Sequence, residues 1–203
     1  MEPIEIEPNP LLINYFHKSR GLYTDLDGSL PQFCDNEEWH YILSNLETNI
    51  FLLKRLDERG LLKKENKIVD CGIGLGTALY DIMIQSQDFP QSTFEFTGIE
   101  KEEKYLNYLE ENLLHFWNGR LNLIHSDIMT CDYQTFNIIY SYCPFKTHDK
   151  LKTFYGKISS EIKSGSVIIE NREGGLGFEH SLTNFSDSLE KVDLDGQWIF
   201  VKK

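Results

Sequence analysis

The stretch DCGIGLG, residues 70–76, decides the fold, because it places three alternating glycines between two elements of regular structure. Before it, KIVD at residues 67–70 is a short apolar run that predicts a buried strand. After it, residues 77–89 predict a helix. A glycine-rich turn lets a ligand approach the backbone, and the following helix N-terminus offers free N–H groups. The unit therefore predicts a ligand site of the α/β nucleotide-binding kind.

The alternation of strand and helix continues along the chain. Strands are predicted at residues 93–100, 121–125, 136–141 and 166–170, and helices at 36–60, 101–118 and 148–163. Strands separated by helices imply an α/β, Rossmann-like, mostly parallel sheet with helices on both faces. Residues 189–194 and 197–201, joined across Asp195-Gly196, predict a C-terminal antiparallel hairpin.

The first 34 residues read differently from the rest. Prolines at positions 3, 8, 10 and 31 exclude one long helix, a short amphipathic piece is predicted at residues 11–18, and residues 21–31 have loop chemistry. We expect an N-terminal arm or flap at residues 1–34, followed by one domain at residues 35–203. The arm either lies on the surface or covers a bound ligand.

Composition narrows the possible partners. With 203 residues, 40% of them hydrophobic, the chain suits one folded domain. The formal net charge of −12 makes nucleic acid an unlikely partner, because such binding needs clustered Lys and Arg. The four cysteines form no zinc-type spacing, so no metal site is predicted and a cytoplasmic protein is expected. No apolar run approaches the ~18 residues of a membrane span.

Acidic residues stand at the ends of three successive predicted strands: Asp70, Glu100 and Asp127. Open α/β sheets bind ligands at this edge, where Glu100 can accept ribose hydroxyls and Asp127 an adenine amine. Asp70 precedes the glycine turn and would repel a pyrophosphate, whereas it suits a cationic ligand. A cationic adenosine ligand accounts for all three acids. Each acid alone has an ordinary alternative role as a capping or turn residue.

With these features the sequence resembles the class I S-adenosylmethionine-dependent methyltransferases over roughly residues 36–203. The loop, the acids at 100 and 127, the segment FNIIYSYCPF at residues 136–145 and the closing hairpin carry the resemblance. It implies S-adenosylmethionine as the cofactor of the domain at residues 35–203. The implied cofactor-binding residues are Asp70, Cys71, Gly72, Gly74, Gly76, Glu100, Lys101, Asp127 and Ile128.

The resemblance places the methyl acceptor at the turn that follows the fourth strand. Tyr142, Pro144 and Phe145 are the predicted catalytic residues lining the acceptor pocket, and Phe145 is a candidate to stack on the acceptor. Tyr142 stands where amine-methylating members have Asn, Asp or Ser, so Ser141 or the Tyr142 hydroxyl would have to replace that acceptor group. The thiol of Cys143 is predicted to be structural. The backbone carbonyl of Cys143 can accept a hydrogen bond from an amine.

Three functions remain open from the sequence. The first is methyl transfer to an acceptor, with a protein or a small molecule as the partner and an amine as the favoured group. The second is a regulatory module that binds S-adenosylmethionine without catalysis. The third is a nicotinamide-dependent oxidoreductase, which the loop spacing and Asp70 disfavour. The oligomeric state is not predicted.

Overall fold

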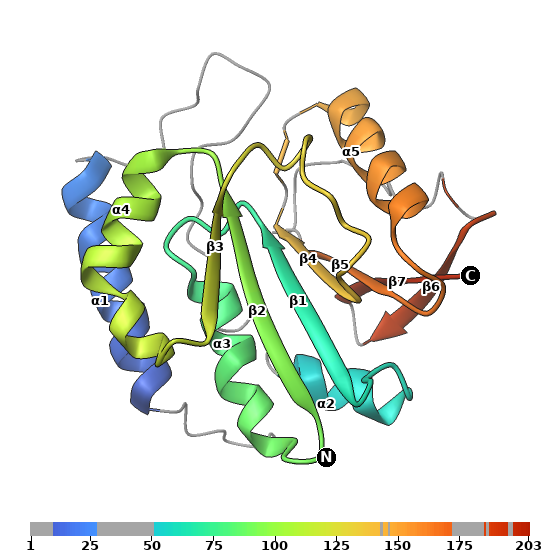
Figure 1. Ribbon diagram of the computed structural model, residues 1–203, viewed down its shortest axis with the longest axis horizontal. Helices are drawn as coiled ribbons and strands as arrows, with labels where there is room; N and C mark the ends of the chain where they lie inside the picture. The colour runs from blue at the N-terminus through green and yellow to red at the C-terminus, as the bar shows by residue number, and fades with distance from the viewer. Residues whose placement is uncertain are drawn as a thin grey trace.

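One sheet organises the computed structural model, which describes residues 10–27, 51–142, 144–145, 147–171, 185, 187–194 and 197–203 (Figure 1). Within these ranges the sheet has seven strands in the order β3-β2-β1-β4-β5-β7-β6. The strands are β1 Glu65–Cys71, β2 Thr93–Glu100, β3 Leu121–His125, β4 Ile138–Tyr142, β5 Val167–Asn171, β6 Leu189–Leu194 and β7 Gln197–Lys202.

The pairing of these strands confirms the predicted fold class. Strands β3, β2, β1, β4 and β5 run parallel, and β7 pairs antiparallel with both β5 and β6. The chain winds outward from β1 in both directions, because β1 lies between β2 and β4. In open α/β sheets, ligands bind outside the carboxyl ends of the strands at such a switch point. The glycine loop begins at this place.

Alternate residues of each strand feed two apolar cores, one on each face of the sheet. Ile68 and Phe96 pack in the first core with helices α1 Pro10–Asp27, α2 Leu52–Glu58, α3 Thr77–Gln85 and α4 Glu103–Asn112. Val69 and Ile99 pack in the second core with α5 His148–Glu161. The short 3₁₀ helices are η1 Ser86–Asp88 and η2 Leu114–Trp117. Helices therefore cover both faces, as predicted.

The prediction of loop chemistry at residues 21–31 is wrong for residues 21–27, because α1 continues to Asp27. Pro10 occupies the first helical position, where its missing N–H is not needed. Tyr15 is fully buried and stacks on Tyr80 of α3 at 4.0 Å between ring centroids. This tertiary packing of α1 offsets the roughly 1 kcal/mol that Gly21 costs inside the helix. Part of the predicted arm is thus a layer of the domain, and the predicted boundary at residue 34 lies outside the described residues.

The helix predicted at residues 36–60 does not include Phe51, which is the first residue of that range that the structure describes. Its φ of 60° is left-handed, so α2 begins only at Leu52, while residues 36–50 lie outside the described part of the chain. Gly60, at φ 67°, follows the end of α2, as predicted. The helix predicted at residues 101–118 is divided, because Leu113 at φ −123° separates α4 from η2.

The connection from β3 to β4, residues 126–137, contains turns and no helix. Beside it a groove of about 550 Å³ lies over β2 and β3, lined by Lys67, Glu95, Thr97, Ile99, Asn122, Ile124, Ser126, Cys131, Asp132, Thr135 and Phe136. Its mixed polar lining fits a sheet face in contact with water. In the part of the chain that the structure describes, no helix has the length and apolarity to cross a membrane.

Candidate functional site

The glycine loop is held open by its backbone conformation. Gly72, Gly74 and Gly76 have φ values of 90°, 52° and 76°, a region that favours glycine. The N–H groups of Gly72 and Ile73 both donate to the Ile99 carbonyl at 2.9 Å, which fixes the loop over β2. A side chain added at Gly72 would meet nothing within 4 Å, so the backbone there is open to a ligand. No side chain caps the N-terminus of α3.

Asp70, the last-but-one residue of β1, is the most unusual group at this edge. Its side chain is only 4% exposed, and no hydrogen bond reaches its carboxylate from any described residue. Burial, with a smaller contribution from the charge of Glu100, raises the pKa of Asp70 to about 8. A buried carboxylate without a partner costs stability. A buried titratable group with a strongly raised pKa at this edge makes Asp70 a candidate functional residue.

Glu100, at the end of β2, holds three backbone segments together. Its Oε2 accepts the N–H of Gly74 at 3.0 Å, and its Oε1 accepts those of Lys101 and Glu102 at 2.9 and 3.0 Å. Burial raises the pKa of Glu100, while these hydrogen bonds act in the opposite direction. Because each carboxylate oxygen has two acceptor sites, Oε2 can accept one further donor. Lys101 contributes its backbone N–H here, and its side chain is exposed.

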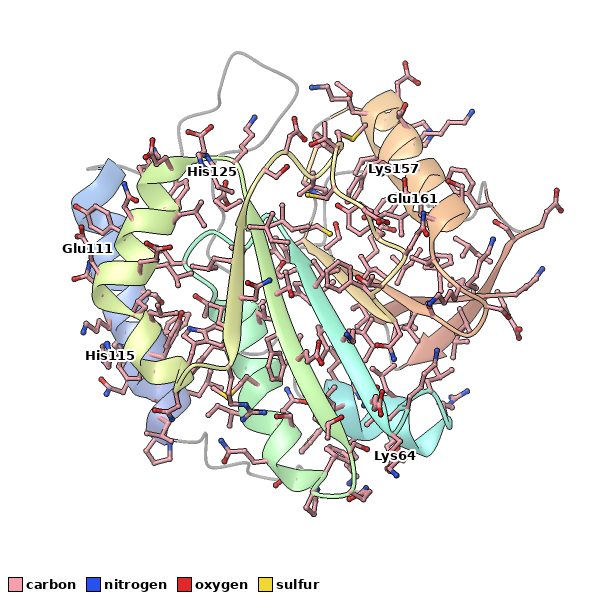
Figure 2. All side chains as sticks on the ribbon, viewed as in Figure 1. Lys64, Glu111, His115, His125, Lys157 and Glu161 are labelled. Carbon is pink, nitrogen blue, oxygen red and sulfur yellow. The ribbon has the colours of Figure 1, made fainter. Side chains whose placement is uncertain are left out.

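Asp127 and Ile128 follow β3 at the same edge. Asp127 Oδ1 accepts the Met129 N–H at 2.8 Å, so one carboxylate oxygen stabilises the turn. The second oxygen receives no hydrogen bond from the described residues. Ile128 is buried, and His125 at the end of β3 (Figure 2) has its Nε2 3.0 Å from the Lys101 carbonyl oxygen. Asp127 thus has a structural role and a free oxygen together.

Cys71 adjoins the loop only through its backbone. Its side chain points to the face opposite Asp70, is 2% exposed, and lies in the core beside α5. The thiol is 3.7 Å from the Tyr133 hydroxyl, and burial raises the pKa of Cys71 well above its ordinary value. This is an inert structural thiol rather than a reactive one.

The acceptor residues predicted after the fourth strand lie in different surroundings. Tyr142 and Pro144 are half-buried beside the switch point. Phe145 is 2% exposed and packs edge-on against Phe154 of α5 at 5.6 Å, which favours a packing role over the predicted stacking on an acceptor. Ser141 Oγ lies 3.3 Å from the Tyr155 hydroxyl. Cys143 lies outside the described residues.

Helix α1 contributes site contacts that the sequence did not indicate. The Tyr15 hydroxyl donates to the Leu75 carbonyl at 2.7 Å and accepts the Trp117 Nε1–H at 3.2 Å. A side chain at Gly76 would approach the Tyr15 hydroxyl to 3.0 Å, so the third glycine also makes room for this support. Tyr15 and Trp117 are 102 residues apart, and no local pattern links them.

Gly98→Ala is expected to displace the glycine loop. A Cβ at Gly98 would overlap Ile73 Cδ1 and lie 2.9 Å from Ile73 Cβ and Cγ2, so we expect the free energy of unfolding to fall by about 2–3 kcal/mol. Urea denaturation measures this change. Gly156→Ala in α5, whose new Cβ meets only ordinary 3.5 Å contacts, should instead stabilise by about 0.5–1 kcal/mol. Unchanged stability for Gly98→Ala, or no partial recovery on adding Ile73→Ala, would contradict the expected overlap.

The structure thus brings Asp70, Glu100 and Asp127 to one edge around the glycine loop, with Tyr142 across the switch point. Among the described residues, no group of three or more His, Cys, Asp or Glu side chains is placed to hold a metal ion.

No protein-family model and no curated protein matches the sequence.

Solved structures with this fold are similar to the chain. A Listeria monocytogenes protein assigned as a class I S-adenosylmethionine-dependent methyltransferase superimposes with a TM-score of 0.64 and 14% identity, over 97% of this chain and 70% of its own. A Methanococcus maripaludis protein assigned as an S-adenosylmethionine-dependent methyltransferase gives 0.57 and 14%, over 98% and 97%. The Thermus thermophilus 16S rRNA N2 methyltransferase, solved with AdoMet and guanosine, gives 0.55 and 20%, over 77% and 43%. The chain therefore has the fold of the class I methyltransferases.

Proposed function

We propose that this protein transfers a methyl group from S-adenosylmethionine to an amine of a protein or a small molecule. The observation that carries the proposal is the buried Asp70 carboxylate, which has no hydrogen-bond partner among the described residues and stands at the start of an open glycine loop. A cationic ligand supplies what this group lacks.

The residues at the edge fit the parts of S-adenosylmethionine. Asp70 suits the ammonium and sulfonium charges, and the uncapped start of α3 suits a carboxylate. Glu100 Oε2 has room for one ribose hydroxyl, and the second oxygen of Asp127 has room for the adenine amine. A pyrophosphate on the glycine loop would instead face the buried acid Asp70, which argues against the nicotinamide alternative.

When bound, S-adenosylmethionine supplies an electrophilic methyl group for in-line displacement. The chain's own residues orient the two reactants and shield them from water. The glycine loop and the three acids hold the methyl donor, while Tyr142 and Pro144 border the place of the methyl acceptor across the switch point.

A non-catalytic binding module is the second candidate, and one observation favours it. The Ser141 hydroxyl faces Tyr155, and Phe145 is buried against α5, so neither presents itself to an acceptor. The chain would then have an intact site for S-adenosylmethionine without a complete site for a methyl acceptor.

The acceptor class is tested by methyl transfer from labelled S-adenosylmethionine to a cell lysate divided into protein, small-molecule and RNA fractions. The net charge of −12 favours the first two fractions over RNA. The rRNA methyltransferase among the similar structures makes RNA the necessary third fraction. We expect label in the protein or small-molecule fraction and none with Asp70→Asn. Label in RNA would overturn the acceptor class, and tight cofactor binding without any transfer would favour the binding module.

A further inference from the structure

Tyr133 lies in the β3–β4 connection, and its side chain joins two segments of the proposed cofactor site. Its side chain is fully buried. Its hydroxyl donates a hydrogen bond to the Ile128 carbonyl at 2.8 Å. The same hydroxyl oxygen accepts the S–H of Cys71, with the sulfur 3.7 Å away. One hydroxyl therefore links the residue after Asp127 to the residue that opens the glycine loop.

Helix α5 fixes Tyr133 from the opposite side. The Tyr133 N–H donates to Glu161 Oε2 at 3.1 Å, and Glu161 also forms an ion pair with Lys157. Lys157 Nζ lies 5.4 Å from the centre of the Tyr133 ring, and Phe154 packs against the ring edge-on at 6.2 Å. Lys157 and Glu161 are labelled on α5 in Figure 2. The ring is thus held independently of its hydroxyl.

We propose that Tyr133 is a positioning residue for S-adenosylmethionine, which fixes the Asp127–Ile128 segment against the start of the glycine loop. This inference rests on the proposed function. Tyr133 touches no ligand itself; it acts by satisfying the buried Ile128 carbonyl, so that the free oxygen of Asp127 has a defined position. Without the hydroxyl, the turn at residues 127–130 must be ordered by the ligand on binding.

The test is Tyr133→Phe, which keeps the ring and removes one hydroxyl. Calorimetry with S-adenosylhomocysteine, well below the unfolding temperature of each variant, should show a Kd raised about tenfold, the expected effect of one buried hydrogen bond. Tyr155→Phe is the matched control, because it removes a buried hydroxyl of the same core that bonds Ser141 instead. Its Kd should change less than about twofold.

A double-mutant cycle separates positioning from general stability. In an Asp127→Asn background, Tyr133→Phe should raise the Kd by less than about threefold, because both substitutions disable the same segment. A full tenfold effect in that background, or an unchanged Kd in Tyr133→Phe alone, would overturn the inference. If the wild-type protein binds no S-adenosylhomocysteine, the proposed function fails first, and that result is distinct from either of these.

Discussion

Glu100→Gln is expected to raise the Kd for S-adenosylmethionine about hundredfold and to lower the free energy of unfolding by about 2 kcal/mol. Glutamine keeps one acceptor oxygen and brings an NH2 donor among the N–H groups of Gly74, Lys101 and Glu102. At least one of these buried donors then loses its partner, at a cost of about 1–3 kcal/mol. If that donor is the Gly74 N–H, the loop loses one of its attachments to β2, while the hydrogen bonds of Gly72 and Ile73 to Ile99 remain. Calorimetry and urea denaturation measure the two effects.

Glu95→Gln provides the matched control on the same strand. Glu95 forms an exposed ion pair with Lys67 at 3.1 Å, and its side chain is 70% exposed. Exposed pairs of this kind contribute about 0–1 kcal/mol, so both stability and cofactor affinity should remain close to those of the wild type. Equal losses in the two variants would show that Glu100 has no special role.

Asp70→Asn is expected to stabilise the ligand-free protein while weakening S-adenosylmethionine binding about hundredfold at pH 8. The folded-state pKa of Asp70 is raised to about 8 from an ordinary 3.8. Between these values the native state keeps a proton that the unfolded state has lost, so the free energy of unfolding falls as pH rises from about 4 to about 8. Asp70→Asn has no titrating group at this position, so its free energy of unfolding does not fall in this way. Its advantage over the wild type should grow by about 1.4 kcal/mol per pH unit across this range and reach about 5 kcal/mol at pH 8 in denaturation curves.

The same titration predicts how cofactor affinity depends on pH. A cationic ligand favours the ionised form of Asp70, so binding releases a proton below pH 8. Wild-type affinity should rise by up to about tenfold per pH unit toward pH 8 and level off above it. Any titration of the ligand itself is common to both proteins, so subtracting the Asp70→Asn profile isolates this residue. Parallel profiles for the two proteins would exclude Asp70 as the cation-binding group.

Local patterns were sufficient for the elements that position the site. Strands β2 and β3 begin and end where the sequence predicts, because apolar runs and turn residues define their limits locally. The three acids meet at one edge because parallel strands align their carboxyl ends there.

Features set by distant contacts were not predictable from one sequence. The Tyr15 hydroxyl reaches Leu75 only because α1 packs on α3, and Phe51 adopts a conformation that its residue type disfavours. Phe145 is buried by α5, whose position follows from the whole sheet. No local pattern marks Tyr133, because its partner Cys71 is 62 residues away in the sequence. In each case tertiary packing decides what the local pattern leaves open.

The central claim is that the edge formed by Asp70, Glu100 and the glycine loop binds a cationic adenosine cofactor. The most direct measurement is isothermal titration calorimetry of the folded wild-type protein at pH 8, with S-adenosylmethionine and NAD in separate titrations. We expect one site per chain with a micromolar Kd for S-adenosylmethionine and no heat with NAD. No binding heat with S-adenosylmethionine, or preferential binding of NAD, would contradict the claim.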